Sequence, residues 1–250
     1  MTTVGLLECD HVSASRRDIA GDYADMFRAM FAAHVPAVDL VAFDVIGGAP
    51  LPALDACDAW LVPGSRHSVY DDDRPWIPPL AAFVRAAHAG GRPLAGVCFG
   101  HQMVAHALGG RVEPAPGGWG AGVAEVRLRP GAAEPWMDPP ADRLALHFMH
   151  QDQVLALPPG GVALGGSDHC PVALLRVGSL VGVQAHPEFV PAYTDALLAA
   201  RVAAIGDDEV AAARASLSRP TDEGTMARWL GRALGAPVSP AWAPPGPAAR

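Results

Sequence analysis

Short strand-like runs alternate with longer segments of helical period in the first part of the chain. The strand-like runs are Val4–Glu8, Val38–Phe43, Ala59–Val62 and Leu94–Val97. Between them, Tyr23–Ala33 and Ile77–Ala89 carry apolar residues three and four positions apart, as amphipathic helices do. Strands that alternate with helices are typical of a mainly parallel sheet with helices on its faces. We therefore predict an α/β fold.

The second part of the chain has a different pattern, in which short strand candidates are separated by Gly and Pro turns. These candidates are Val123–Leu128, Leu144–Phe148, Val162–Gly165, Val172–Arg176 and Val181–Gln184. They predict an antiparallel elaboration of the sheet. Three helical segments follow, at Tyr193–Ala204, Asp208–Ser216 and Thr225–Leu234. We expect one main domain over residues 1–204, a C-terminal helical extension over 205–234, and a disordered tail rich in Pro and Ala over 235–250.

Composition limits the partners and the location that we expect. The chain has 250 residues, 50% of them hydrophobic, which is enough for a large core, and its net charge of −8 disfavours nucleic acid and anionic membrane surfaces as partners. No apolar run approaches the roughly 20 residues that span a bilayer, and no secretory signal precedes the first strand. We therefore expect a cytoplasmic protein.

Cys98 lies where a buried strand runs into a helical segment, between Gly96 and Gly100. A sharp strand-to-helix turn flanked by glycines exposes the side chain at its apex. The N–H groups at the start of the helix also favour a thiolate over a thiol. Taken alone, the pattern allows two interpretations: a nucleophile, or a small buried residue at the end of a strand.

His186 and Glu188 supply the partners that a cysteine nucleophile needs. They follow a strand pattern and are separated by Pro187, which favours extended backbone at His186. In extended backbone, residues two apart share a face, so the carboxylate can orient the imidazole while the other ring nitrogen faces a thiol. This arrangement predicts a triad of nucleophile, base and orienting acid.

With these two motifs, the sequence resembles the class I glutamine amidotransferases, particularly the domain found in GMP synthase and its free-standing relatives. The segment from Gly96 to Gln102 matches the nucleophile signature, and that from Gly182 to Glu188 matches the signature of the base. The order and wide separation of the motifs also fit. The resemblance implies a flavodoxin-like fold, with a mainly parallel central sheet flanked by helices, and a Cys98–His186–Glu188 triad.

The resemblance also assigns roles to residues outside the triad. It implies an oxyanion hole formed by the backbone N–H groups of Ser65 and Phe99, although the family usually has glycine where Ser65 stands. It further implies that the substrate is held by Gly64, Gln102, His150 and Gln151.

The chemistry implied by the resemblance needs no cofactor and no metal. His147 and His150, three residues apart, are a conceivable pair of metal ligands, as is His169 beside Cys170, but no third ligand has matching spacing in either case. Cys9, Cys57 and Cys170 form no CxxC pair and are expected in the core.

The function that the resemblance implies is hydrolysis of the γ-amide of glutamine through a glutamyl thioester. The ammonia would pass to a separate synthetase subunit, because the roughly sixty residues after Glu188 are too few for a synthetase domain and contain no P-loop. Two alternatives remain: a free-standing hydrolase of γ-glutamyl peptides or conjugates, and a non-catalytic binding or regulatory subunit.

Overall fold

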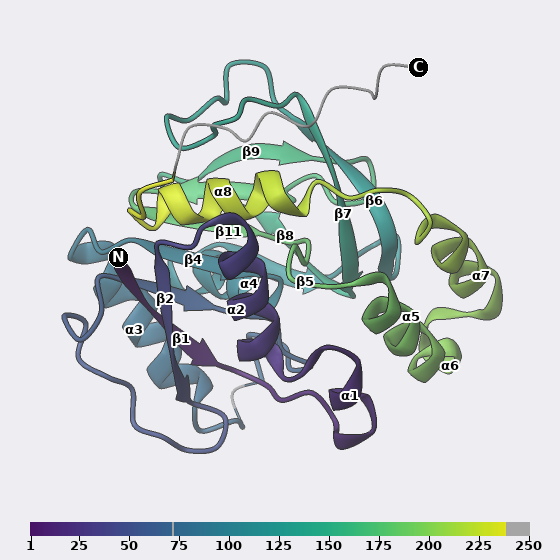
Figure 1. Cartoon of the computed structure of the whole chain (residues 1–250), viewed down its shortest axis with the longest axis horizontal. Coiled ribbons are helices and arrows are strands. Elements are labelled where there is room, and N and C mark those ends of the chain that lie inside the picture. The colour runs from purple at the N-terminus through teal and green to yellow at the C-terminus, as the bar shows by residue number, and fades with distance from the viewer. Residues whose placement is uncertain (72, 239–250) are drawn as a thin grey trace.

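A nine-stranded mixed sheet forms the centre of the protein in a computed structural model that describes residues 1–71 and 73–238 (Figure 1). Its strands are β1 (Thr2–Glu8), β2 (Val38–Asp44), β3 (Ala59–Val62), β4 (Leu94–Val97), β6 (Gly120–Leu128), β7 (Arg143–His150), β9 (Val162–Gly166), β10 (Leu174–Val177) and β11 (Leu180–Val183). They lie in the order β2-β1-β3-β4-β11-β10-β9-β6-β7.

The sheet has a parallel half and an antiparallel half. The pairings β1–β2, β1–β3, β3–β4 and β4–β11 are parallel, and those from β11 through β10, β9 and β6 to β7 are antiparallel. Counting β11 as the fifth parallel strand gives the order 2-1-3-4-5 of flavodoxin-like sheets. The predicted fold class is confirmed.

Beside this sheet lies a two-stranded one, β5 (Arg111–Pro114) with β8 (Asp152–Ala156), which the sequence analysis did not predict because both strands are short and begin with polar residues.

Helices cover both faces of the parallel half (Figure 1). The pair α2 (Tyr23–His34) and α8 (Glu223–Ala233) packs on one face, and the pair α3 (Ile77–Ala89) and α4 (Phe99–Ala107) packs on the other. The remaining long helices, α5 (Pro191–Ala200) and α7 (Asp207–Ser216), lie beside β6 and β7 with the short α6 (Val202–Ile205). Two single-turn elements, η1 (Ala14–Arg16) and α1 (Arg17–Ala20), follow β1.

The prediction of a single helix over residues 193–204 is wrong, because the backbone of Arg201 leaves helical geometry and separates α5 from α6.

Alternation along β3 shows how the sheet divides the core. Leu61 belongs to the cluster that contains Phe27 of α2 and Trp229 of α8, whereas Trp60 belongs to the opposite cluster with Phe83 of α3. Successive side chains of a strand point to opposite faces, so each face receives its own helical layer. Because Trp229 is fully buried, the C-terminal helix contributes to the same core as the first strands.

The C-terminal region is described as far as residue 238. Ala236 is buried and belongs to the core cluster that contains Trp229, and Val238 packs against that cluster. The rest of the expected tail, 239–250, lies outside the described residues. In the part of the chain that the structure describes, no helix is both long and apolar enough to cross a membrane.

The turn between β4 and α4 packs closely against the neighbouring strand. A Cβ atom added at Gly96 would lie 2.2 Å from the carbonyl oxygen of Gly100, and one added at Gly100 would lie 2.0 Å from the carbonyl oxygen of Val62 in β3. Both contacts are with backbone, which side-chain rotation cannot relieve. Glycine at these two positions therefore lets α4 begin directly beside β3 and β4.

We predict that Gly100→Ala lowers the free energy of unfolding by about 2–3 kcal/mol, because the added methyl group displaces α4 from β3. Gly90→Ala is a matched control, since its Cβ would lie 3.3 Å from the nearest atom at a φ of −84°. The control should change stability by less than about 1 kcal/mol. Urea denaturation of the two variants tests this, and equal stabilities would contradict the close packing.

Candidate active site

Cys98 is the N-cap residue of α4 and has a strained backbone. Its φ of 52° and ψ of −101° make it the one non-glycine residue with positive φ in residues 1–71 and 73–238. Its N–H donates to the carbonyl oxygen of Val183 at the end of β11 over 2.8 Å, and its own carbonyl oxygen accepts from Gln102 N–H over 3.0 Å. Strain of this kind persists only where surrounding contacts enforce it, and it is concentrated at functional sites.

His186 and Glu188 lie in the turn that follows β11, the neighbour of β4. The Nδ1–H of His186 donates to Oε1 of Glu188 over 2.7 Å, and both side chains are almost completely buried. The His186 ring stacks on Phe189 with centroids 3.9 Å apart and planes 9° apart. Its backbone N–H donates to His147 in β7 over 2.8 Å. The imidazole is therefore fixed by a carboxylate, an aromatic ring and its own backbone.

Gly64 connects the turn after β3 to these two groups. A Cβ atom at Gly64 would lie 2.8 Å from Cε1 of His186 and 3.8 Å from Cβ of Cys98. The turns after β3, β4 and β11 thus converge at the carboxyl edge of three adjacent parallel strands, the edge at which ligands bind in open α/β sheets. The structure brings Cys98, His186, Glu188 and Gly64 together at this edge of the sheet.

The charge of His186 differs from that of its neighbouring histidines. Burial by itself lowers the pKa of His186, but the Glu188 carboxylate and the Cys98 sulfur outweigh burial and raise it above the usual value for histidine. Burial and the nearby His186 lower the pKa of His147 to about 4, and burial together with surrounding histidines lowers that of His150 to about 3. The site therefore favours one protonated imidazole beside neutral ones.

Ser65 and Phe99 lie in the turns beside Cys98. The hydroxyl of Ser65 donates to the carbonyl oxygen of Cys9 over 2.9 Å and accepts from the N–H of His67 over 3.2 Å, so the side chain holds the loop. Within the described part of the chain, neither the N–H of Ser65 nor that of Phe99 has a hydrogen-bond acceptor. In the part of the chain that the structure describes, these two backbone donors are therefore not used by the protein itself.

A cavity of about 180 Å³ opens beside Cys98. This is below the usual range of roughly 300–1,000 Å³ for drug-sized ligands and suits a compound of amino-acid size. Its walls include the predicted site residues Ser65, Gln102, His150 and Gln151. The amide of Gln102 is also held internally, because its Nε2 donates to the carbonyl oxygen of Asp152 over 2.8 Å. His150 Nε2 lies 3.2 Å from Gln153 Nε2, so the interior already uses one of its ring nitrogens.

Asp152 is a cavity residue to which the sequence analysis assigned no role. Its Oδ2 accepts hydrogen bonds from the hydroxyl groups of Ser68, over 2.5 Å, and Tyr70, over 3.0 Å. The loop after β3 is also tied to the end of β1, where the Arg66 guanidinium meets Asp10 at 2.7 Å. The His-x-Asp pattern at residues 150–152 was the available signal for Asp152; its partners are distant in sequence.

Trp119, Met149 and Arg201 complete the cavity, and the sequence analysis did not select them. Met149 and Trp119 belong to the hydrophobic cluster around α5 and α7, which also contains Phe189 and Tyr193. Arg201 stands at the break between α5 and α6. Met149 directly precedes the His-x-Asp pattern at residues 150–152, whereas no sequence motif marks Trp119 or Arg201.

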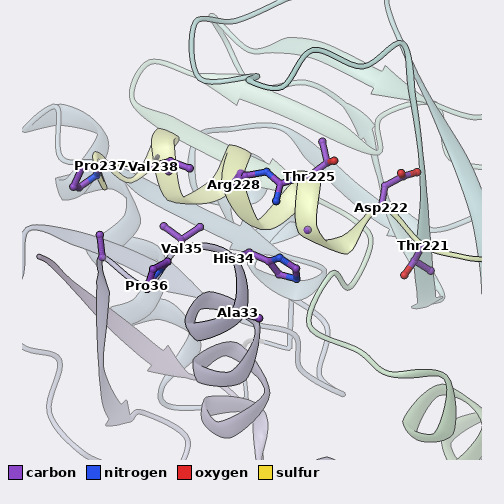
Figure 2. A pocket seen from close by; sticks show the side chains of 12 residues that line it. Ala33, His34, Val35, Pro36, Thr221, Asp222, Thr225, Arg228, Pro237 and Val238 are labelled. Atoms are coloured by element: carbon purple, nitrogen blue, oxygen red, sulfur yellow. The ribbon is translucent and has the colours of Figure 1, made fainter. Parts of the chain in front are cut away.

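A larger cavity, of about 660 Å³, lies away from Cys98, between the end of α2 and the start of α8. Figure 2 shows His34 and Arg228 at this cavity, with Asp222 and Thr225 near the first turn of α8. It contains none of the predicted site residues. Among the described residues, no group of three or more His, Cys, Asp or Glu side chains is arranged to hold a metal ion.

The sequence matches the family of class-I glutamine amidotransferases over residues 43–203. It is 31% identical over 140 residues to gamma-glutamyl peptidase 5 of Arabidopsis thaliana, in an alignment that covers 54% of this chain and 55% of the peptidase. It is 33% identical over 133 residues to the glutamine-hydrolyzing GMP synthase of Thermomicrobium roseum, covering 51% of this chain and 23% of the synthase. The matches thus span about half of the first relative and about a quarter of the second.

The fold also overlays on that of a solved protein. The crystal structure of a glutamine amidotransferase from Thermotoga maritima matches with a TM-score of 0.75 and 19% sequence identity, covering 93% of this chain and 98% of that one. The resemblance inferred from the two motifs is thereby confirmed. The chain belongs to the class I glutamine amidotransferase family.

Proposed function

We propose that this chain hydrolyses the γ-amide of glutamine. In this proposal Cys98 is the nucleophile and His186 carries the proton. Glu188 orients the His186 imidazole and keeps it protonated. The observation that carries this proposal is the convergence of the strained Cys98 turn and the His186–Glu188 pair on adjacent parallel strands. A non-catalytic binding subunit, the third function considered from the sequence, would not need a strained cysteine beside a buried pair of this kind.

The first half of the reaction forms a thioester. The Cys98 thiolate attacks the γ-carbonyl carbon, and the N–H groups of Ser65 and Phe99 donate to the oxyanion of the tetrahedral intermediate. The C–N bond then breaks as the protonated His186 gives its proton to the leaving nitrogen, which departs as ammonia. In the second half, His186 takes a proton from water, the hydroxide attacks the thioester carbon, and the C–S bond breaks to release glutamate and the Cys98 thiolate.

The cavity walls suggest how the glutamyl part is held. The carboxylate of Asp152 offers a partner for the α-ammonium group, and its hydrogen bonds to Ser68 and Tyr70 fix its position. Gln102 and Gln151 line the same cavity, and Gly64 leaves room beside the sulfur. The lowered pKa of His150 keeps its imidazole neutral, so in this proposal the ring forms hydrogen bonds but does not attract an anion.

The destination of the nitrogen is a separate proposal. A synthetase subunit that receives the ammonia is consistent with the relation to GMP synthase, of which the match covers 23%. Hydrolysis of γ-glutamyl conjugates without a partner is the second candidate. The observation that favours it is the match to a gamma-glutamyl peptidase over 55% of that protein's length.

We predict that Cys98→Ala lowers the glutaminase rate by about 10⁴-fold or more, because the thioester cannot form. The measurement is glutamate release by the purified protein, with the circular dichroism spectrum compared to confirm folding. Cys57→Ala, at a buried position that precedes β3 whereas the site lies after it, is the control and should retain the wild-type rate. Wild-type turnover by Cys98→Ala would contradict the assignment of the nucleophile.

We predict that Glu188→Gln moves the alkaline limb of the kcat/KM profile to lower pH by at least about 1 unit. The reaction needs protonated His186, whose raised pKa keeps the proton in place as the pH rises. Removing the carboxylate removes the main cause of the raised pKa, so the proton, and with it the activity, is lost at a lower pH. Glu113→Gln in the exposed strand β5 should leave the profile unchanged. An unmoved limb in Glu188→Gln would show that the carboxylate does not set this pKa.

A further inference from the structure

Asp10, two residues after the end of β1, is a buried carboxylate that the proposed reaction does not use. Its Oδ2 accepts from the backbone N–H of Arg66 over 2.9 Å, and its Oδ1 accepts from the backbone N–H of His11 over 2.8 Å. The Arg66 guanidinium meets the same carboxylate at 2.7 Å and donates to the carbonyl oxygen of His11 over 2.9 Å. Since a buried charge is costly without partners, these contacts hold one another in place. Asp10 therefore fixes the backbone of the loop after β3 as well as a side chain.

The hydrogen bond from the Arg66 N–H fixes the peptide group between Ser65 and Arg66. The peptide group between Pro63 and Gly64 is fixed as well, because the carbonyl oxygen of Pro63 accepts from the N–H of Gly100 over 3.1 Å. Between these two lies the peptide group that carries the Ser65 N–H. A peptide group is planar, and it turns only through the φ and ψ angles on either side of it. Fixing both neighbours therefore limits how far the Ser65 N–H can turn.

The Ser65 side chain adds a third restraint on the same loop. Its hydroxyl donates to the carbonyl oxygen of Cys9 over 2.9 Å and accepts from the N–H of His67 over 3.2 Å. Cys9 directly precedes Asp10, so two consecutive residues after β1 hold the loop. Glycine, the residue that the family resemblance leads one to expect at position 65, has no hydroxyl for these bonds and allows a wider range of φ.

We infer that Asp10 is a positioning residue that, with the Ser65 hydroxyl, keeps the Ser65 N–H directed at the oxyanion of the tetrahedral intermediate. This inference rests on the proposed thioester chemistry of Cys98, in which that N–H is one of two oxyanion donors. Asp10 acts through Arg66, which lines the cavity beside Cys98. The oxyanion exists only after the sulfur has attacked. A displaced donor therefore slows the chemical step and leaves the binding of glutamine unchanged.

We predict that Asp10→Asn lowers kcat for glutamine about 10- to 100-fold and leaves KM within about threefold of wild type. The amide keeps the size of the carboxylate, but its nitrogen only donates, so it cannot accept at both positions that the carboxylate uses. Asp195→Asn in α5 is the matched control, because it removes an exposed carboxylate that is paired with Arg214 at 2.6 Å. The control should retain the wild-type kcat. A kcat in Asp10→Asn within about twofold of wild type would overturn the inference.

Alkylation of Cys98 by iodoacetamide separates this role from general support of the site. The reaction is a direct displacement by the thiolate and forms no oxyanion, so its rate reports only the thiolate and its accessibility. We expect Asp10→Asn to be alkylated within about twofold of the wild-type rate. Cys98→Ala gives the background from the other cysteines, all of which are buried. A parallel loss of kcat and of alkylation would overturn the inference, because Asp10 would then support the whole site.

Ser65→Ala tests the same restraint should the circular dichroism spectrum show that Asp10→Asn does not fold. It removes the hydroxyl but keeps the backbone N–H, and it should lower kcat about 3- to 10-fold with alkylation unchanged. An unchanged kcat in that variant would count against the inference in the same way. Hydrolysis of glutamine by Cys98→Ala at the wild-type rate would instead overturn the thioester chemistry. If Cys98→Ala is inactive and Asp10→Asn fully active, only the role of Asp10 is lost.

Discussion

The close approach of backbone around the Cys98 turn is the constraint on which the rest of the site depends. With glycine at positions 96 and 100, the start of α4 lies against β3 and β4, and Cys98, midway between the two glycines, takes a φ of 52°. Because Gly64 has no side chain, the turn after β3 also lies directly against the His186 imidazole. Three turns after parallel strands thus meet without side chains between them, and each turn supplies one part of the site.

The electrostatics of the site follow from its burial. A buried ion pair is stable only with good geometry and further hydrogen bonds, and the 2.7 Å contact between His186 and Glu188 meets the first condition. The neighbouring histidines avoid repulsion by remaining neutral, since burial lowers the pKa values of His147 and His150. Among the buried imidazoles, protonation is thereby favoured at His186, where the proposed reaction needs a proton donor.

The antiparallel half of the sheet and the helices that follow it form the second wall of the cavity. β7 and β8 bring Met149 and Asp152 to Cys98, and the break between α5 and α6 brings Arg201. In our proposal, β8 holds Asp152, which binds the α-ammonium group, whereas the parallel half holds the residues that perform the chemistry.

The α/β class and most of the strands and helices were predictable from the sequence alone, which also predicted that Cys98, His186, Glu188 and Gly64 belong to one site. Each of these depends on a local pattern: hydrophobic period, a glycine-flanked turn, or two residues that share a face of an extended segment. Three features are visible only in the folded protein: Asp152 accepts hydrogen bonds from Ser68 and Tyr70, the helix expected over 193–204 breaks at Arg201, and Trp119 and Arg201 line the cavity. These features depend on contacts between segments that are far apart in the chain, and no local pattern encodes which distant residues will meet.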